Sequence, residues 1–360
     1  ALVVEAGTVA DMRARFEDAY RRQFSFLMPG RPLVVEAVSV EAIAPGESVA
    51  ASSHAGGEAA SAMPVARVPM HASGRWHEVP LYQRDALGAG AAIDGPAILA
   101  EANATTVVEP GWRATLRADG NLVLERVVPR EQRVAIGTSV DPVMLEIFNN
   151  LFMSIAEQMG LRLQNTAYSV NIKERLDFSC ALFDADGSLI ANAPHMPVHL
   201  GSMGESIKTV IRENSGRIRP GNVYVLNAPY NGGTHLPDVT VITPVFDEVG
   251  REVLFYVGSR GHHADIGGIT PGSMPPDSKV VEEEGVLIDN FLMIEEGRFR
   301  EAETRALLAS GRWPARNVDQ NIADLQAQVA ANEKGVQELR RMVAQFTLDT
   351  VRAYMLHVQD

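Results

Sequence analysis

Hydrophobic residues in the first third of the chain recur mainly in short runs separated by turn residues, which is the spacing of β-strands. One amphipathic pattern precedes them and predicts a helix over 9–27, which Pro29 and Gly30 end. A run rich in β-branched residues over 33–40 predicts the first strand. Further strands are predicted over 65–70, 76–81, 97–100, 105–108, 113–116 and 122–127.

Two stretches interrupt this pattern. Residues 44–64 are mainly Ala, Ser, Gly and Pro, a composition that cannot offset the entropy cost of ordering, so we expect a mobile loop there. The composition changes again over 129–140, which we interpret as a linker. The sequence therefore predicts two domains, 1–128 and 141–360.

The second domain opens with the signals of a long helix. Asp141 is suited to the N-cap and Pro142 to the first helical position, and apolar residues follow along one face. Further on, Ser202 and Glu205 have the spacing of a capping box and predict a helix over 203–214.

A regular seam of apolar residues runs through 318–346, in steps that alternate between four and three. Asn332 is its one polar member. Such a seam can indicate a coiled coil. Gly335 weakens an isolated helix, however, which favours a long helix packed within its own domain or against a partner.

Strands are also predicted in the second domain, over 178–183, 189–191, 223–226, 240–245 and 253–257, and the last two form a hairpin. Cys180 lies in the first of these strands and is interpreted as a small core residue. The predicted fold is thus α+β. An N-terminal, mostly-β module with one leading helix is followed by a larger mixed α+β domain with long helices.

Composition limits the partners and the cellular location that can be expected. The net charge of -13 argues against nucleic acid or an anionic membrane as a partner, because both require basic patches. The single Cys excludes an internal disulfide framework and fits a reducing compartment. No apolar run reaches the roughly 18 residues of a membrane span, so we expect a cytoplasmic protein. The chain begins without Met and ends within a helical pattern, and we expect it to be part of a longer protein.

Candidate chemistry is concentrated in two His-x-x-Asp groups, His235/Asp238 and His262/Asp265, on either side of the predicted hairpin. Imidazole nitrogens and carboxylate oxygens suit Zn, Mn or Fe. The glycines around both groups remove side chains where the backbone would approach a ligand closely. Because a hairpin returns the chain to where it started, the two groups are expected to meet at one metal or catalytic centre.

The ligand set is not unique. His262 and His263 are adjacent, so on an extended backbone they point to opposite sides, and at most one is expected to join His235 and Asp238. The simplest assembly is a facial triad of His235, Asp238 and His262 with open positions for water or substrate. Asp265 could ligate the metal, accept a hydrogen bond from an imidazole or act as a general base.

Two other polar clusters are candidates for the same site. Lys173–Asp177 places several charges before a strand, either as a solvated face or as a polar wall of the site. His195 and His199 lie among prolines, and we expect His199 near the site, whereas His195 is left open.

Five separated blocks, in this order, resemble the hydantoinase B/oxoprolinase family over about 137–360: Lys173–Ala181, Ala193–Met203, Asn231–Thr240, Ser259–Gly268 and Glu282–Ile288. Residues 1–128, with the segments 95–98 and 105–112, resemble the C-terminal part of the partner family, hydantoinase A. An A-type tail that runs into a B-type head is similar to the single-chain 5-oxoprolinase type.

The resemblance implies an ATP-dependent hydrolase of cyclic amides. In that type ATP phosphorylates the lactam carbonyl oxygen in the A-type part, and the B-type part opens the activated ring to glutamate. The nucleotide-binding lobes do not match any part of this sequence, so ATP and those lobes are expected as partners, and a homo-oligomer is expected.

The resemblance also implies a divalent metal, with Mn, Zn or Fe expected and Mg possible. The related acetone carboxylases hold a metal with two His and one Asp, which match His235, Asp238 and His262, with His263 as the alternative to His262. Further catalytic roles are expected for Asp265, His263 and His199.

The substrate is expected to be a small lactam or hydantoin. A 5-oxoproline site needs a cation for the substrate carboxylate, for which Arg260 or Arg175 is the candidate, with Glu174 beside them as a further substrate-binding residue. An N-substituted hydantoin hydrolase or a ketone carboxylase would share the scaffold. The non-enzymatic alternative is an interaction module whose His and Asp pairs are structural.

Overall fold

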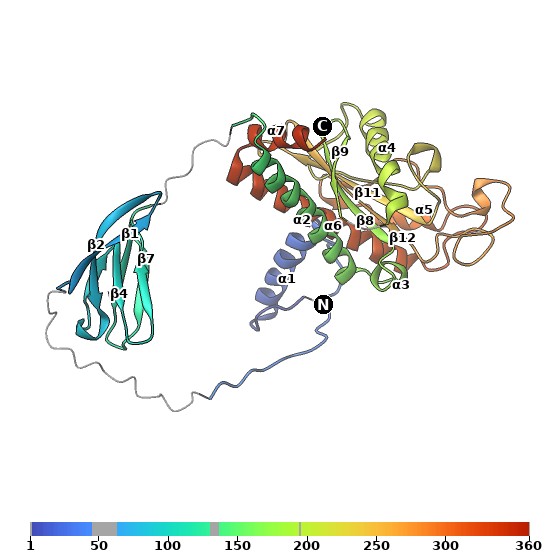
Figure 1. Cartoon of the computed structure of the whole chain (residues 1–360). Coiled ribbons are helices and arrows are strands. Elements are labelled where there is room, and N and C mark those ends of the chain that lie inside the picture. The colour runs from blue at the N-terminus through green and yellow to red at the C-terminus, as the bar shows by residue number, and fades with distance from the viewer. Residues whose placement is uncertain (1, 45–62, 130–136, 194–195, 360) are drawn as a thin grey trace. The chain divides into compact units, whose positions relative to one another are not determined.

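The computed structural model of the chain describes residues 2–44, 63–129, 137–193 and 196–359 (Figure 1). Contacts between residues divide the chain into two compact units, 37–134 and 1–36 together with 135–360. The expected fold class is confirmed, since a strand-rich region with one leading helix precedes a mixed region with long helices. Most of the expected mobile loop and of the expected linker lies outside the described residues.

The smaller unit is built from two sheets, β1-β2-β4-β5 and β3-β6-β7. The six strands predicted over 65–127 are confirmed, and the three-residue β3 was not predicted. The core between them is apolar, with Leu99 and Val108 fully buried. Its elements are β1 Ala66–Ala72, β2 Arg75–Gln83, η1 Arg84–Ala86, β3 Ala92–Asp94, β4 Ala97–Ala100, β5 Thr105–Val108, β6 Trp112–Leu116 and β7 Leu122–Arg126.

The strand predicted over 33–40 is wrong. None of the described strands pairs with this run, and Val34 and Val40 are exposed. The physical reason is that β-branched residues favour a strand only where a neighbouring strand and a half-buried surface are present.

The leading helix α1 spans Val9–Phe24, capped at Thr8 and ended by Ser25 in a left-handed conformation. The following residues belong to the larger unit. Phe26 is buried there, with its ring 5.1 Å from that of Phe299, and Arg31 pairs with Glu301. The contact-based units thus divide the chain at a different place from the expected domains, whose boundaries stay a prediction.

The larger unit is organised around a seven-stranded antiparallel sheet with the order β14-β13-β10-β11-β12-β8-β9. The predicted strands and the β11–β12 hairpin are confirmed, whereas β13 and β14 were not predicted. Its strands are β8 Phe178–Asp184, β9 Leu189–Asn192, β10 Val223–Leu226, β11 Asp238–Phe246, β12 Val253–His262, β13 Phe291–Glu295 and β14 Arg298–Phe299.

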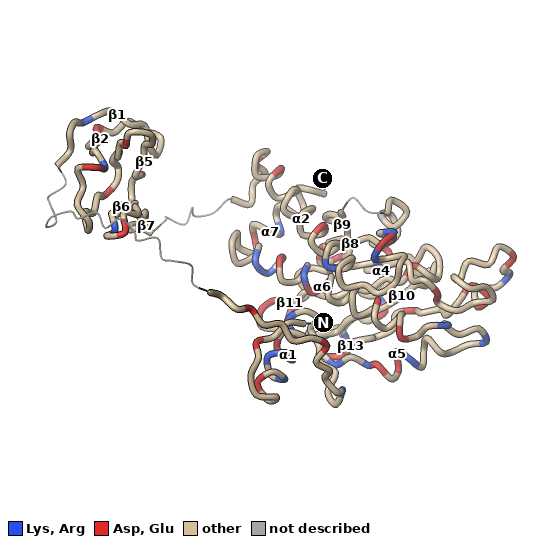
Figure 2. Tube along the Cα trace, turned by 90° about the horizontal axis from the view of Figure 1, so that it is seen from below, with Lys and Arg blue, Asp and Glu red and all other residues tan. Residues whose placement is uncertain are grey.

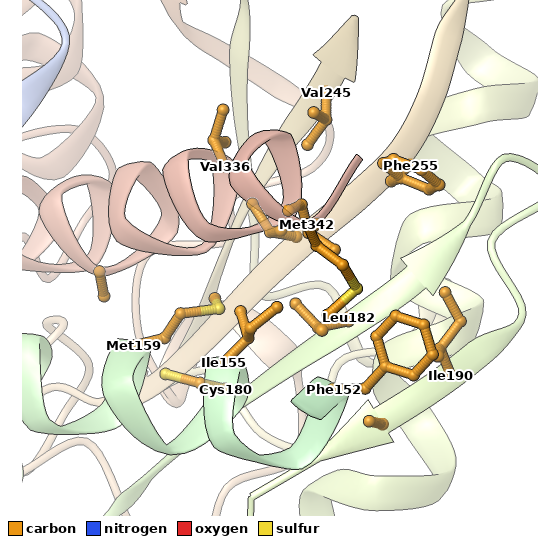
Figure 3. Packing of buried hydrophobic residues seen from close by; sticks show 14 of the residues in the cluster. Phe152, Ile155, Met159, Cys180, Leu182, Ile190, Val245, Phe255, Val336 and Met342 are labelled. Carbon is orange, nitrogen blue, oxygen red and sulfur yellow. The ribbon is translucent and has the colours of Figure 1, made fainter. Parts of the chain in front are cut away.

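Helices cover both faces of this sheet (Figure 1). The long helices α2 and α6 pack on one face. The side chains of Met159, Cys180, Leu182 and Met342 lie in the core between these helices and the sheet (Figure 3). Helix α4 packs on the other face over Phe183 and neighbouring side chains. The helices are α2 Pro142–Thr166, α3 Val170–Lys173, α4 Pro197–Glu213, η2 Pro229–Asn231, η3 Val281–Glu283, α5 Glu301–Leu308, α6 Val318–Phe346 and α7 Leu348–Gln359.

The seam of α6 faces its own unit, as the favoured interpretation expected. Asn332 is buried and donates a hydrogen bond of 3.0 Å to the carbonyl oxygen of Val241. Gly335 lies where α6 meets α2, because a Cβ there would come within 2.5 Å of the Met159 sulfur. The glycine that weakens an isolated helix therefore permits close packing in this one.

The predicted start of helix α4 is wrong, whereas that of α2 is confirmed. Asp141 caps α2 as expected, accepting a bond of 2.9 Å from the backbone N–H of Met144. Helix α4, however, begins at Pro197 and not at 203. Proline is suited to a first helical position. Ser202 is inside the helix, where its hydroxyl accepts a hydrogen bond from Arg260 and does not cap.

Charged residues are interspersed along both units in the described part of the chain (Figure 2). The sheet of the larger unit is mostly apolar. Asp238 and Arg260 are exceptions, since both are charged side chains buried on central strands. Burying charged groups is costly unless they are paired or hydrogen-bonded, so these two residues indicate a functional region.

Candidate metal centre

Three neighbouring strands bring polar residues into one row at the same edge of the sheet. Asp238 at the start of β11 pairs with His262 at the end of β12. On the other side of β12, Gly261 pairs with Phe178, and the His262 N–H donates a hydrogen bond of 2.9 Å to the carbonyl oxygen of Asp177. Residues opposite one another in a sheet point to the same face. Asp238, His262 and Asp177 therefore lie side by side.

Three side-chain atoms of this region form a nearly equilateral triangle. His235 Nε2 and His262 Nδ1 lie 3.1 Å and 3.0 Å from Asp238 Oδ1, and 3.2 Å from each other. Metal-to-ligand bonds of about 2.1 Å put neighbouring ligands about 3.0 Å apart in an octahedron and about 3.4 Å apart in a tetrahedron. The spacing fits three ligands on one face of a single divalent ion. We call His235, Asp238 and His262 the triad.

The triad is most open to solvent at His235. The side chain of His235 is 35% exposed, whereas those of His262 and Asp238 are 13% and 4% exposed. Water or a small molecule could therefore approach from the side of His235, whereas His262 and Asp238 are largely covered. This is the arrangement expected for a site that keeps positions free for substrate.

The second carboxylate oxygen of Asp238 is held by the protein. Its Oδ2 accepts hydrogen bonds from the Thr234 hydroxyl and from His199 Nε2, the latter at 3.1 Å. Because a carboxylate can only accept, His199 Nε2 donates this bond, and the Ser179 hydroxyl lies within hydrogen-bond distance of His199 Nδ1, 2.9 Å away. Such contacts fix the orientation of a ligand and leave only Oδ1 for an ion.

The electrostatics favour an ionised Asp238. Burial acts to raise its pKa, but hydrogen bonds from His199, His235, His262 and Thr234 together lower the pKa well below its usual range. The hydrogen bond to Asp238 in turn raises the pKa of His235, although burial acts against it. A buried carboxylate that stays negative is the type of group that attracts a cation.

Arg260 supports the site from inside the protein. The side chain is fully buried and donates four hydrogen bonds: to Thr240 Oγ1 at 2.7 Å, Ser202 Oγ at 2.6 Å, Ser206 Oγ at 3.0 Å and the Gly232 carbonyl at 2.6 Å. Burial lowers its pKa to about 10, which leaves it charged at neutral pH. The structure does not bring Arg260 to the open side of the triad, where a substrate role would need it.

The glycines near the first His-x-x-Asp group act differently from what was expected. A Cβ on Gly232 would lie 2.4 Å from the backbone nitrogen of Ser206, and one on Gly233 would lie 2.3 Å from the carbonyl oxygen of Asn227. The close approach is therefore between parts of the chain itself. Gly232 therefore lets the loop before His235 pack against α4, and Gly233 lets it pack against the residues that follow β10.

His263 and Asp265 do not join the triad. His263 points to the opposite face, as adjacent strand residues should, where it is buried and hydrogen-bonded to Gln328 at 3.1 Å and to Asn321 at 3.0 Å. Asp265 lies beyond the strand and pairs with Arg316 at 2.7 Å. Of the two alternatives left open by the sequence, His262 is the one that meets His235 and Asp238. Catalytic roles for His263 and Asp265 have no support in this geometry.

The turn between α3 and β8 borders the triad. Glu174 and Arg175 are exposed in this turn. Leu176 adopts a φ of 57°, which non-glycine residues rarely do, and Asp177 Oδ2 lies 3.9 Å from His262 Nδ1. His199 is brought to the site as predicted, whereas His195 lies outside the described residues.

Sequence reasoning missed the roles of Thr234 and Ser179, and it left open whether the charged cluster that contains Asp177 is a solvated face or a polar wall of the site. Thr234 adjoins the first His-x-x-Asp group, so proximity alone could have marked it. Ser179 and Asp177 required knowledge that β8 pairs with β12, for which the sequence carries no local signal.

Fold and site together define a mixed α/β protein with a candidate mononuclear metal centre at the edge of an antiparallel sheet. The chain belongs to the hydantoinase B/oxoprolinase family, whose model matches residues 141–360. The hydantoinase/oxoprolinase C-terminal domain matches residues 4–125. Both resemblances seen in the sequence are thereby confirmed.

Two 5-oxoprolinases match both parts of the chain. The chain is 43% identical to 5-oxoprolinase 1 of Arabidopsis thaliana over 98% of its own length, and 41% identical to 5-oxoprolinase of Dictyostelium discoideum over all of it. It spans 28% of the length of each of these relatives. The structure of an ATP-dependent caprolactamase from Pseudomonas jessenii is similar over 62% of this chain and 37% of that one, with a TM-score of 0.55 and 30% identity. None of the helices within the described ranges combines the length and apolar character that a membrane span requires.

Proposed function

We propose that this chain carries the ring-opening site of an ATP-dependent hydrolase of cyclic amides, of the 5-oxoprolinase type. The whole reaction would convert 5-oxo-L-proline, ATP and water to L-glutamate, ADP and phosphate. ATP would be used by lobes outside this chain. The observation that carries the proposal is the triad, whose three ligand atoms lie 3.0 to 3.2 Å apart in a chain that 5-oxoprolinases match from end to end.

The extent of the matches favours 5-oxoproline over other substrates. The 5-oxoprolinases align with both parts of the chain, whereas the caprolactamase structure covers 62% of it. An N-substituted hydantoin hydrolase and a ketone carboxylase remain the alternatives that share the scaffold. A cytoplasmic location and a homo-oligomeric state stay predictions.

The triad would hold one divalent ion, with His235 Nε2, His262 Nδ1 and Asp238 Oδ1 as ligands. Two nitrogens and one oxygen suit Mn, Zn or Fe, and less so Mg. When bound, such an ion supplies Lewis-acid chemistry, polarising a carbonyl group and making water more acidic. His199 and Thr234 would keep Asp238 in place, since both hydrogen-bond to its other oxygen.

The substrate carboxylate would meet a cation on the open side. Arg175 is the better of the two predicted arginines, because it is exposed in the turn that borders the triad, with Glu174 beside it. Arg260 would position the site, since it ties α4 to the loop before His235.

Elemental analysis of the purified chain tests the metal site. We expect about one Mn, Zn or Fe per chain, lost in His235→Ala because one of three ligands is removed. His71→Ala in the smaller unit is the matched control and should keep the metal. A wild-type chain that stays metal-free after incubation with these ions would overturn the metal centre and favour the interaction module.

A further inference from the structure

We propose that Gln328 of α6 is a positioning residue for the triad. It would fix the register of β11 and β12 and so keep Asp238 and His262 opposite each other. Gln328 lies with His263 on the face of the sheet opposite to the triad, and it would therefore act through the two strands. The inference rests on the proposed function, because it concerns the metal that the triad would bind.

The amide group of Gln328 joins both strands of the hairpin. The side chain is fully buried, and its Nε2 donates to the carbonyl oxygen of Val239 in β11 at 2.9 Å and to that of Ser259 in β12 at 3.0 Å. Carbonyl oxygens can only accept, so the orientation of the amide is determined. Its Oε1 then accepts from His263 Nε2 at 3.1 Å. One side chain thus connects β11, β12 and the residue after His262.

These bonds depend on the register that forms the triad. Asp238 lies opposite His262, and Val239 directly follows Asp238. A slip of β12 by one residue would bring a neighbour of His262 opposite Asp238. The same slip would move the carbonyl oxygen of Ser259 by about 3.4 Å along the strand. One amide could then no longer reach both carbonyl oxygens, so the two bonds of Nε2 favour the register in which His262 meets Asp238.

The chain leaves room for this contact between helix and strand. A Cβ on Gly261 would lie 2.8 Å from Ile172 Cδ1 and 3.6 Å from Gln328 Cδ. The glycine before His262 therefore lets these side chains pack close to the backbone of β12. The Ser259 hydroxyl in turn donates to the backbone carbonyl oxygen of Gln328 at 3.3 Å. Helix α6 and strand β12 are thus joined by a side chain from each.

Asn332 offers a matched comparison, because it is a buried amide one turn further along α6. Its Nδ2 donates to the carbonyl oxygen of Val241 at 3.0 Å and to Thr243 Oγ1 at 3.2 Å. Both partners belong to β11, so these bonds do not join the two strands. Loss of either amide should loosen the packing of α6 on the sheet. Only loss of Gln328 should free the register next to the triad.

The test compares the full 360-residue wild-type chain with Gln328→Met and Asn332→Leu. Met and Leu are close in shape to Gln and Asn but cannot donate a hydrogen bond, so each variant removes buried bonds without opening a large cavity. Thermal unfolding of the metal-free chains measures stability, and competition with a chromophoric chelator measures Zn²⁺ affinity. We expect both variants to unfold at a lower temperature than the wild type. Gln328→Met alone should bind Zn²⁺ more weakly, by about tenfold.

Cobalt provides a second measurement, because the visible absorption of bound Co²⁺ depends on the geometry of its ligands. At saturating Co²⁺ we expect a changed spectrum for Gln328→Met and the wild-type spectrum for Asn332→Leu. His263→Ala removes the partner of Oε1 but keeps both bonds of Nε2, so it should keep the wild-type affinity and spectrum. If Gln328→Met does not fold, Gln328→Asn takes its place, since an amide that is one methylene shorter should lose at least one of the two bonds.

The possible outcomes separate the two proposals. Wild-type affinity and spectrum in a folded Gln328 variant would overturn the positioning role and leave the proposed function standing. An equal loss of affinity in Asn332→Leu would also overturn the positioning role, because general loosening of the packing would then be the cause. A wild-type chain that binds neither Zn²⁺ nor Co²⁺ would overturn the metal centre, on which both proposals rest.

Discussion

The two His-x-x-Asp groups have the same residue types at the same spacing, yet the protein uses them differently. In the first, both His235 and Asp238 belong to the triad. In the second, His262 alone belongs to it, while Asp265 lies past the end of β12 and pairs with Arg316. The difference arises because Asp238 starts a strand that pairs with β12, whereas Asp265 follows a strand that has ended. Strand register, more than motif spacing, decides which residues meet.

The largest expected effect separates the two aspartates. Asp238→Ala removes a metal ligand. It should therefore weaken metal binding by more than the factor of about 10 to 100 that follows from loss of a residue hydrogen-bonded to a ligand. Asp265→Ala should leave the affinity unchanged. Competition with a chromophoric chelator measures both. Equal losses in the two variants would show that the motifs are equivalent after all.

An intermediate effect on metal affinity is expected to distinguish two buried histidines, His199 and His263. His199→Ala should weaken metal binding about 10- to 100-fold, since Asp238 Oδ2 loses a hydrogen bond that orients the ligand. His263→Ala, on the opposite face of the sheet, serves as the control and should retain wild-type affinity. If His263→Ala weakened binding as much as His199→Ala, orientation of Asp238 would not be the cause.

The smallest expected effect concerns stability. Asp265→Asn should lower the free energy of unfolding by about 1–2 kcal/mol, because the side chain loses both the charge paired with the partly exposed Arg316 and an oxygen that accepts a backbone N–H. Denaturant unfolding of the metal-free chain measures this change. An Arg316→Gln background should abolish the part that comes from the ion pair, and a full effect in that background would contradict the assignment of Asp265 to a structural pair.

Much of the site was accessible from the sequence because it depends on local signals. Two short runs of apolar and β-branched residues predicted the β11–β12 hairpin, and a hairpin necessarily returns His262 towards His235. The choice between His262 and His263 was not accessible, since neighbouring residues on a strand differ only in the face they point to. A shift of one residue in register would exchange them. The position of Asp177 was left open for a related reason, because β8, the strand that follows it, pairs with β12 from far away in the sequence.

Other differences follow from competition between partners. Ser202 has the spacing of a helix cap, but a buried guanidinium uses its hydroxyl, so the helix starts earlier, at Pro197. The run over 33–40 has the composition of a strand without a neighbour to pair with. In both cases the local pattern was real, and the outcome depended on a group elsewhere in the chain.

In the β11–β12 hairpin, the length of the turn does not affect the positions of the ligands. Asp238 and His262 are 24 residues apart in sequence but face each other across one strand pair. The turn that joins the strands is about 27 Å away, since β11 rises about 3.4 Å per residue over its nine residues. Residues added at the exposed Val249 would lengthen the turn and leave the ligands in place. This turn is therefore a natural point at which to graft a reporter peptide.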